Sequence, residues 1–432
     1  MCKHRRVKNG RREQQRVVIV GQGYVGLPLA MRAVEVGHTV VGLDADPARV
    51  ARLKAGDSYV EDISDEVLAA ALAGGHYEPT NDPARSGGYD VAVITVPTPL
   101  REGLPDLTYI EQGAAEMGRH LRPGATVVLE STTYPGTTEE LVAPILERES
   151  GLRAGADFHL GYSPERIDPG NPEWNLVNTP KVVSGIDAAS LAVVQSFYDT
   201  IVDKTFAVSG CKEAELTKLL ENTFRHVNVA LVNELAMFAA DLGIDVWESI
   251  DAASSKPFGY MRFTPGPGVG GHCLPIDPSY LSWRVKRLLG QSFRFVELAN
   301  DVNDHMPDYV AQRISVALNR RRLAVNGCRV LLLGLAYKRN TSDDRESPAV
   351  VVADRLVALG AEVRFADPHV ERSHADRHVV RVDCTPAEVA AADIVVILTD
   401  HDSFDYEMVA AEAVHVLDTR RRLPVAANVE SL

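Results

Sequence analysis

Cys273 follows a segment rich in glycine and proline, residues 264–271, and Asp277 follows Cys273 four residues later. Glycine has no Cβ, so a backbone rich in it can approach a ligand closely and adopt positive φ angles. A thiolate on such an exposed loop could act as a nucleophile. The alternative is a buried structural cysteine, which is the commoner fate of a free thiol. Packing alone is not expected to call for so many glycines and prolines, so we favour the nucleophile.

A second candidate for chemistry is the segment Gly21-Gln-Gly-Tyr-Val-Gly26, which follows a short β-branched run. Residues 27–36 are predicted to form a helix, and residues 39–43 a second strand that ends at Asp44. A strand, a glycine turn, a helix, a strand and an acid in this order make up the dinucleotide-binding fingerprint.

Each fingerprint residue has a predicted role. Gly21 allows the tight turn, Gly23 lets the backbone reach a pyrophosphate, and Gly26 lets the helix and the strand pack closely. The N-terminus of the helix would face the phosphates. Asp44 would accept hydrogen bonds from the adenosine ribose hydroxyls, and its charge would repel a 2′-phosphate. The sequence therefore predicts NAD rather than NADP as the cofactor.

Polar residues follow three further predicted strands, at residues 90–96, 125–129 and 159–162. These polar segments are Pro97-Thr98-Pro99, Glu130-Ser131-Thr132 and Ser163-Pro-Glu165-Arg166. Because α/β sheets bind ligands at the carboxyl ends of their parallel strands, these residues are candidate ligand contacts. Turn chemistry would explain the prolines, but it explains the hydroxyl cluster less readily.

Residues 213–242 have the apolar period of one long helix. Lys218, Asn222 and Arg225 are spaced i, i+4 and i+7, so they lie on one face of that helix. A solvated face is the usual explanation of such a pattern. Asparagine is a poor helix former, however, and three asparagines lie in this helix. A ligand-facing stripe and a solvated face are both open from spacing alone.

A second α/β unit begins at residues 329–334 and repeats the order of the first, with a strand, a helix, a strand and then Asp367. Its glycine fingerprint is eroded, so we expect a second doubly wound domain that is less suited to a dinucleotide. The strongly charged segment 337–347 follows the first strand of this unit. Lys338 and Arg345 could contact phosphates there, or they could be solvated surface charges.

The chain's 432 residues are too many for one core and indicate two or three domains. A formal net charge of −14 argues against general nucleic-acid binding. The five cysteines are scattered without a CxxC pair, which fits a reducing cytoplasmic location and excludes a disulfide framework and the common zinc spacings. No apolar run is long enough to span a bilayer. The basic segment 1–15 lacks an apolar signal region, and we expect it to be a disordered tail.

A nicotinamide site together with a nucleophilic cysteine indicates one broad chemistry. Oxidation of an alcohol gives an aldehyde, the thiolate of Cys273 adds to it, and a second oxidation leaves a thioester that water hydrolyses to a carboxylate. The thiolate is needed because an aldehyde cannot lose a second hydride until a tetrahedral adduct forms. Lysine and asparagine side chains can stabilise the oxyanions, and a carboxylate can order or deprotonate the water. Basic residues in a second domain would suit a phosphorylated substrate in a cleft between domains.

From about residue 16 to residue 423, the chain resembles the UDP-glucose/GDP-mannose dehydrogenase family. The motifs that carry the resemblance are Gly21-Gln-Gly-Tyr-Val-Gly26, Val96-Pro-Thr-Pro99, Glu130-Ser-Thr132, Ser163-Pro-Glu165, Lys218-Leu-Leu-Glu-Asn222, Gly270-Gly-His-Cys273 with Asp277, and Lys338 to Ser347. The resemblance implies an α/β fold of two Rossmann-like doubly wound domains joined by a central helical region, whose long helix also builds a homodimer. The expected divisions are a basic tail at 1–15, an NAD-binding domain at 16–205, a helical dimerisation and catalytic region at 206–308, and a nucleotide-sugar-binding domain at 309–432.

The resemblance also implies roles for single residues in the oxidation of a UDP-sugar to its uronic acid. Cys273 would form the thiohemiacetal and the thioester, Lys218 would act on the C6 oxygen, and Asn222 would hold that oxygen. Asp277 and Thr132 would position the hydrolytic water. The implied catalytic set is Thr132, Glu165, Lys218, Asn222, Cys273 and Asp277. The implied NAD contacts are Gly21, Gly23, Tyr24, Val25, Gly26, Asp44, Arg49, Thr98, Ser131 and Arg345. The implied substrate contacts are Glu165, Arg166, Lys218, Asn222, Arg225, Lys256, Gly270 and Lys338.

Two positions depart from the UDP-glucose enzymes of the family. Pro169 stands where those enzymes carry a second glutamate, and Ile276 stands where they carry a lysine before the aspartate. Both differences resemble the branch that oxidises UDP-N-acetylhexosamines. The run that begins at Lys256 is most similar to the UDP-N-acetylglucosamine 6-dehydrogenases, with UDP-N-acetylmannosamine as the close competitor and UDP-glucose as a further alternative substrate.

Two functions of other kinds compete with this expectation. A two-electron dehydrogenase of the hydroxyacid type would share the fold and would need no thiol. A catalytically silent NAD-binding regulator would share the fold and show no turnover. The combination of Cys273, Lys218, Asn222 and Asp277 favours the four-electron oxidation over both.

Overall fold

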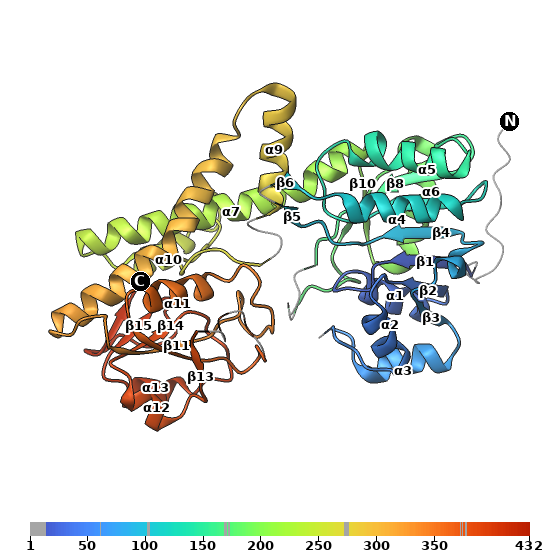
Figure 1. Cartoon of the computed structure of the whole chain (residues 1–432). Coiled ribbons are helices and arrows are strands. Elements are labelled where there is room, and N and C mark those ends of the chain that lie inside the picture. Colours follow the sequence, from blue (N-terminus) through green and yellow to red (C-terminus); the bar gives the residue numbers. More distant parts are fainter. Residues whose placement is uncertain are drawn as a thin grey trace. The chain divides into compact units, whose positions relative to one another are not determined.

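The computed structural model describes residues 14–60, 62–101, 104–167, 171, 173–271, 276–371, 373, 375 and 378–432. The chain divides into two compact units, Met1–Leu220 and Glu221–Leu432, and each contains a six-stranded parallel sheet (Figure 1). The predicted α/β fold, with two Rossmann-like sheets and one long helix, is confirmed. The division between the units falls within that helix, α7 (Cys211–Leu242).

The sheet of the first unit has the strand order β3-β2-β1-β4-β7-β8. Its strands are β1 (Arg16–Val20), β2 (Thr39–Leu43), β3 (Tyr77–Thr80), β4 (Val91–Ile94), β7 (Thr126–Leu129) and β8 (His159–Tyr162). Most of their residues are buried, as expected of a parallel sheet with both faces covered. The chain order reverses between β1 and β4, so Gly21 and Thr95, which follow these two strands, flank the point where such sheets bind ligands.

The helices of the first unit cover both faces of this sheet. They are α1 (Gly26–Glu35), α2 (Pro47–Lys54), α3 (Asp65–Ala73), α4 (Thr108–Arg119), α5 (Ala143–Ser150) and α6 (Ala188–Ile201), with single turns at Pro83–Ser86 and Thr138–Val142. Val17 and Ile19 of β1 share a core with residues of α1, α3 and α6. The alternate residues Val18 and Val20 share a core with residues of α4 and α5. This alternation follows from the two-residue period of a strand.

Two pairs of short strands lie outside the main sheet of this unit. They are β5 (Leu100–Arg101) with β6 (Leu104–Pro105), and β9 (Lys181–Val183) with β10 (Thr205–Ala207). The β9–β10 pair is parallel, and Lys181 is paired with Thr205.

The second unit repeats the architecture of the first. Its sheet has the order β13-β12-β11-β14-β15-β16. The strands are β11 (Arg329–Leu333), β12 (Glu362–Ala366), β13 (Val380–Arg381), β14 (Ile394–Ile397), β15 (Val416–Asp418) and β16 (Val429–Ser431), and the helices that follow strands are α11 (Pro348–Ala358), α12 (Pro386–Ala391) and α13 (Tyr406–Glu412). The predicted echo of the first α/β unit is therefore present in three dimensions.

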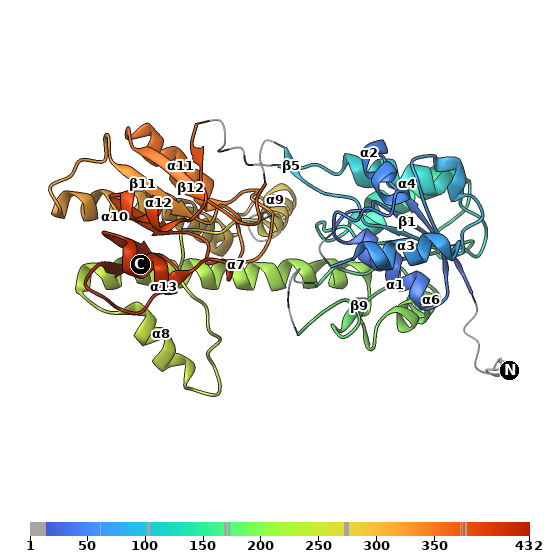
Figure 2. The ribbon, with the colours of Figure 1, turned by 90° about the horizontal axis from the view of Figure 1, so that it is seen from below.

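Three more helices belong to the second unit: α8 (Val246–Ser254), α9 (Asp277–Leu289) and α10 (Arg294–Arg320). Figure 2 shows that the chain turns back after α7, so that α8 lies beside its carboxyl-terminal half, and Trp247 and Ile250 of α8 pack against Val232 and Ala236 of α7. α10 packs along α11 and continues through residues 308 and 309, where the sequence suggests a domain boundary. Among the described residues, no helix has both the length and the apolar composition that crossing a membrane requires.

Candidate active site

The glycine turn after β1 has the geometry of a phosphate-binding turn. Gly21 has a φ of +91°, and a Cβ there would lie 2.9 Å from the carbonyl oxygen of Thr95. A Cβ on Gly26 would lie 1.8 Å from the carbonyl oxygen of Gly21, so the turn and the start of α1 admit no side chain at either position. A Cβ on Gly23, in contrast, would meet nothing within 4 Å. The fold itself does not require glycine at position 23, which fits close approach of a pyrophosphate.

Asp44 lies beside this turn and can still accept hydrogen bonds from a ligand. Its Oδ2 accepts the backbone N–H of Gln22 at 2.8 Å, and its Oδ1 accepts that of Asp46 at 2.9 Å. A carboxylate offers about four acceptor positions, so capacity is left for ribose hydroxyls. A guanidinium nitrogen of Arg49 is 3.7 Å from Asp44 Oδ2. The residues present therefore fit the adenosine half of NAD.

The other proposed NAD contacts of the first unit also lie after parallel strands or in the glycine turn. Tyr24 is exposed and lines a cavity of about 760 Å³ together with Pro28 and Trp174. Thr98 and Ser131 are buried, and the Ser131 hydroxyl donates a hydrogen bond to the carbonyl oxygen of Val96 at 2.8 Å. Val25 precedes α1 as its N-cap residue.

Glu165 follows β8 and lies in a strongly charged environment. Its Oε1 accepts the backbone N–H of Ile167 at 2.5 Å, and Lys181 Nζ lies 3.7 Å from its Oε2. Burial acts to raise the pKa of Glu165, but Lys181, the Ile167 amide and Lys218 together hold this pKa below its usual range. The adjacent Arg166 donates a hydrogen bond to the carbonyl oxygen of Pro180 at 2.6 Å. Sequence reasoning did not identify Lys181.

The long helix α7 buries two of the three polar residues predicted to share a face. Lys218 and Asn222 are 7% and 6% exposed, so a solvated face is wrong for both. Arg225 is exposed. Asn222 Nδ2 donates a hydrogen bond to Asp277 Oδ2 at 2.5 Å, and Asp277 is 1% exposed at the first position of α9. Two predicted catalytic residues, 55 positions apart in the sequence, are thus in direct contact.

Asn233 is a second buried asparagine of α7, and its contacts account for its place in this helix. It is fully buried, donates a hydrogen bond to Asn303 Oδ1 at 2.9 Å, and accepts the backbone N–H of Gly266 at 2.9 Å. The side chain therefore anchors the start of the glycine-rich segment. Asn233 is one of the three asparagines noted in this helix from the sequence, which did not reveal these partners.

The glycine-rich segment before Cys273 packs closely against the segment that follows β11. A Cβ on Gly270 would lie 2.7 Å from the carbonyl oxygen of Glu346, and one on Gly271 would lie 2.7 Å from the ring of Tyr337. The expectation that packing does not call for these glycines is therefore wrong. Cys273 itself, like Pro169, lies outside the described residues.

The remaining predicted substrate and cofactor residues of the second unit are polar and accessible to different degrees. The Arg345 side chain is 53% exposed and forms a salt bridge with Asp343 at 2.6 Å. Lys338 is partly buried, at the start of the loop after β11. Lys256 is exposed, and its Nζ lies 4.9 Å from the centre of the Phe258 ring.

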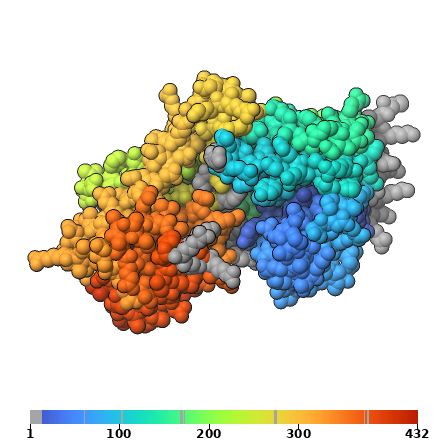
Figure 3. Space-filling view, in the orientation of Figure 1, coloured from blue at the N-terminus to red at the C-terminus, as the bar shows by residue number. Residues whose placement is uncertain are grey.

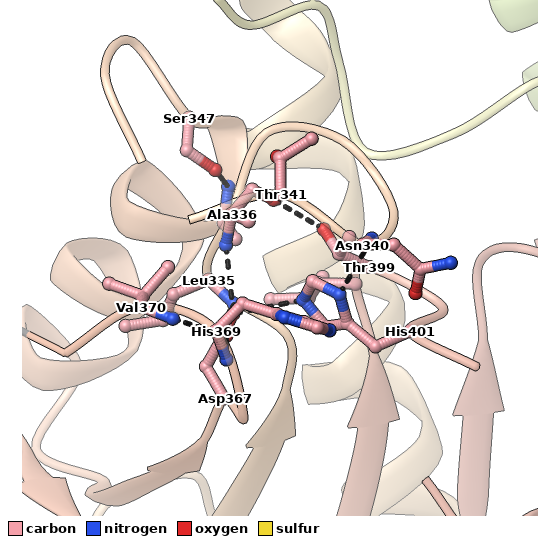
Figure 4. A network of polar contacts seen from close by, with 12 residues as sticks. Leu335, Ala336, Asn340, Thr341, Ser347, Asp367, His369, Val370, Thr399 and His401 are labelled. Carbon is pink, nitrogen blue, oxygen red and sulfur yellow. Dashed lines mark hydrogen bonds and ion pairs between the residues drawn. The ribbon is translucent and has the colours of Figure 1, made fainter. Parts of the chain in front are cut away.

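The position equivalent to Asp44 in the second unit is filled by Asp367, whose carboxylate is fully occupied. Figure 4 shows its contacts with the turn after β11 and with His401. Oδ2 accepts the N–H groups of Leu335 and Ala336 at 2.6 and 3.0 Å and lies 3.0 Å from His401 Nε2. Oδ1 accepts the N–H groups of the two residues at 369 and 370, at 2.8 and 2.9 Å. With five donors on a side chain that is 0% exposed, no acceptor position is left for a ribose.

His401 links this carboxylate to the loop that carries Lys338. Its Nδ1 accepts the backbone N–H of Asn340 at 3.0 Å, so the ring proton is assigned to Nε2, which donates to Asp367. Burial acts to raise the pKa of Asp367, but the bonds from His401 and the backbone amides lower it well below its usual range. The turn that is predicted to hold a dinucleotide in the first unit is thus closed by protein groups in the second.

Three family models match the chain in order. They describe the UDP-glucose/GDP-mannose dehydrogenase family: its NAD binding domain at residues 15–202, its central domain at residues 212–305 and its UDP binding domain at residues 331–424.

Among the described residues, no group of three or more His, Cys, Asp or Glu side chains could hold a metal ion.

Similar proteins cover almost the whole chain. A UDP-N-acetyl-D-glucosamine 6-dehydrogenase of Pseudomonas aeruginosa is 38% identical over 395 residues, which are 90% of this chain and 91% of that protein. A UDP-N-acetyl-D-mannosamine dehydrogenase of Pyrococcus horikoshii is 35% identical over 390 residues, which are 90% of each. A solved structure of a UDP-D-ManNAc dehydrogenase from Pyrococcus horikoshii has a TM-score of 0.87 at 34% identity and covers 96% of this chain and 98% of its own.

Proposed function

The chain belongs to the UDP-glucose/GDP-mannose dehydrogenase family and is an NAD-dependent nucleotide-sugar 6-dehydrogenase, and we propose that its substrate is UDP-N-acetylglucosamine. The product would be the corresponding uronic acid. UDP-N-acetylmannosamine is the second candidate, because the relatives above include enzymes named for each sugar. The buried contact between Asn222 and Asp277 is the observation that carries the assignment of the reacting site to these residues.

In the proposed reaction, Cys273 holds the sugar between two oxidations. Bound NAD supplies the hydride acceptor for both of them. The Cys273 thiolate adds to the C6 aldehyde that the first oxidation leaves, and a carbon–sulfur bond forms to give a thiohemiacetal. The second oxidation converts this adduct into a thioester. Water then adds to the thioester carbonyl and the carbon–sulfur bond breaks, which regenerates the Cys273 thiolate and releases the carboxylate product.

Lys218 and Asn222 are proposed to act on the C6 oxygen. Both are buried, so a charge or a hydrogen bond directed at a developing oxyanion is weakly screened by water there. Lys218 would take the hydroxyl proton or stabilise the oxyanion, and Asn222 would donate a hydrogen bond from its amide. The bond from Asn222 Nδ2 to Asp277 fixes the amide orientation.

Three oxygen-bearing side chains are proposed to serve the hydrolysis. Asp277 and Thr132 would hold the attacking water, and Glu165 would accept its proton. The Glu165 pKa is held below the usual range, so the carboxyl group is ionised at neutral pH and can accept a proton. On the substrate side, we propose Lys338 and the other basic contacts, Arg166, Arg225 and Lys256, as partners of the nucleotide-sugar, with Gly270 beside them.

A face of α7 is proposed to form a homodimer interface. Large apolar side chains along this helix are between 42% and 72% exposed: Leu216, Leu220, Phe224, Leu231, Leu235, Phe238 and Leu242. Part of the helix surface is visible as yellow-green atoms in Figure 3. Because an exposed apolar stripe of this length favours burial against a partner, we propose that the same helix of a second copy covers it. Sedimentation velocity should give a species of twice the chain mass, and a monomer at micromolar concentration would refute this interface.

The substrate is tested by NAD reduction, followed at 340 nm, with UDP-N-acetylglucosamine, UDP-N-acetylmannosamine, UDP-glucose and GDP-mannose. We expect the highest kcat/KM with UDP-N-acetylglucosamine and two NADH per sugar consumed. A higher kcat/KM with UDP-N-acetylmannosamine would change the assigned substrate but not the assigned reaction. One NADH per sugar would instead support a two-electron dehydrogenase.

A further inference from the structure

A buried cluster of charged residues lies next to Glu165 in the first unit. Lys181, in β9, forms a salt bridge with Glu130, and its Nζ lies 3.7 Å from Glu165 Oε2. Tyr198, in α6, donates a hydrogen bond from its hydroxyl to Glu130 Oε2 at 2.7 Å. The Lys181 and Glu130 side chains are 4% and 0% exposed. One ammonium group is therefore shared by two carboxyl groups that are shielded from solvent.

Packing alone does not explain this arrangement. Burying an ion pair is often no better for stability than burying apolar side chains of similar size. Here two carboxyl groups share the Lys181 ammonium group, and the second positive charge, on Lys218, acts on Glu165, so the cost of burial without compensation falls mainly on Glu130. Lys181 also lies with its Nζ 5.4 Å from the centre of the Tyr198 ring, which further confines the ammonium group.

This environment shifts the pKa values of the two carboxyl groups in opposite directions. Burial raises the pKa of Glu130 to about 7, although Lys181 acts to lower it. Burial also acts to raise the pKa of Glu165, but Lys181, the Ile167 amide and Lys218 more than offset it. The shared proton is therefore held by Glu130, and Glu165 is the ionised member of the pair. Two neighbouring carboxyl groups whose environments give them different pKa values are typical of acid–base sites.

We propose that Lys181 is a positioning residue for Glu165: with Glu130 and Tyr198, it keeps the Glu165 carboxylate ionised and fixed for hydrolysis of the thioester. This proposal rests on the proposed function, which gives Glu165 that role. Two other charged groups come close to Glu165. Lys218 of α7 adds a second positive charge, and the neighbouring Arg166 is bonded to a backbone carbonyl.

The test compares Lys181→Met with Lys181→Arg in the full-length enzyme, using the pH dependence of kcat for acid formation. Without the ammonium group, the Glu165 pKa should rise, so kcat should fall on acidification from a higher pH than in the wild type. The acidic limb should therefore move by about one to three pH units toward higher pH, with the KM for NAD unchanged. Lys181→Arg keeps the positive charge, so the acidic limb of its kcat profile should lie close to that of the wild type.

Tyr198→Phe serves as a second variant, since it removes one hydroxyl and leaves the charges in place. Because that hydroxyl acts to lower the pKa of Glu130, its loss should leave the shared proton more firmly on Glu130 and Lys181 to Glu165. The acidic limb should therefore move to lower pH by a smaller amount, and this shift decides the question if Lys181→Met does not fold. Lys204→Met is the matched control, because Lys204 is exposed and immediately precedes β10. A merely structural role of Lys181 would lower the melting temperature and leave the pH profile as in the wild type, which would overturn the proposal.

Glu165→Gln, measured in parallel, separates this proposal from the one on which it rests. If Glu165→Gln releases acid at the wild-type rate, the role of Glu165 in the proposed function fails. If Glu165→Gln is slow while neither Lys181→Met nor Tyr198→Phe changes the pH profile, the role of Glu165 stands and the positioning role of Lys181 is refuted.

Discussion

Replacement of Cys273 by serine is expected to stop release of the uronic acid, with a fall in the rate of acid formation of at least about 10³-fold, or about 4 kcal/mol in activation free energy. A serine hydroxyl at neutral pH is a far poorer nucleophile than a thiolate. The variant should therefore stall after the first oxidation, with no more than one NADH per sugar. NADH at 340 nm and the acid, by anion-exchange chromatography, are measured in the same samples.

Cys384 provides the matched control for this experiment. Burial raises the pKa of its thiol to about 11, so it is not a thiolate at neutral pH, and it lies in the second sheet's apolar surroundings. Cys384→Ser should release acid at the wild-type rate. Full acid formation by the Cys273→Ser enzyme would show that no thioester at this residue is required.

Replacement of Lys218 by methionine is expected to lower kcat and kcat/KM together by about 10²- to 10³-fold, or about 2.7 to 4 kcal/mol. The ammonium group is buried in α7, where its effect on a developing oxyanion is weakly screened, and methionine keeps most of the side-chain volume. An interaction made only in the transition state lowers both constants equally. Steady-state kinetics with saturating NAD provide the measurement.

Lys212 of the same helix is the control for Lys218. Its side chain is 48% exposed and pairs with Glu139 and Glu140 at 3.5 and 3.1 Å, which is the geometry of a weak surface interaction. Lys212→Met should keep wild-type kinetics. If Lys218→Met raises only the KM of the sugar and leaves kcat unchanged, Lys218 binds substrate and does not act on the reacting oxygen.

The dinucleotide turn was predictable because its signals are local. Gly21 and Gly26 lie within one strand–turn–helix segment, and the crowding at each excludes a side chain in the structure as the fingerprint requires. Asp44 directly follows the next strand, so its place beside the turn follows from the parallel pairing of neighbouring strands. The order of buried strands and helices also determines the repeat of this architecture in the second unit.

The cluster around Lys181 was not predictable, because its members come from separate elements. Glu130 follows β7, Lys181 begins β9 and Tyr198 lies in α6, and only the packed fold brings them together. A single lysine at the start of a three-residue apolar strand has no periodicity that would distinguish it from a surface residue.

The glycine-rich segment shows the opposite error, in which a real signal had a different cause. Positions 270 and 271 leave no room for a side chain, because the Glu346 carbonyl group and the Tyr337 ring lie against Gly270 and Gly271. These contacts join segments about 70 residues apart, so sequence spacing could not reveal them. The sequence also carries a misleading signal in α10. Pro307 lies inside this continuous helix, although proline usually ends or kinks a helix.

The oxidised sugar is expected to become covalently attached to Cys273. Asp277→Asn keeps the side-chain shape and an acceptor for Asn222, and it should slow thioester hydrolysis. Peptide mass spectrometry of this variant, acid-quenched during turnover with NAD and UDP-N-acetylglucosamine, measures the intermediate directly. We predict a mass increase corresponding to the sugar acyl group on the peptide that contains Cys273. NADH formation with that peptide unmodified, or with the adduct on another cysteine, would contradict the account.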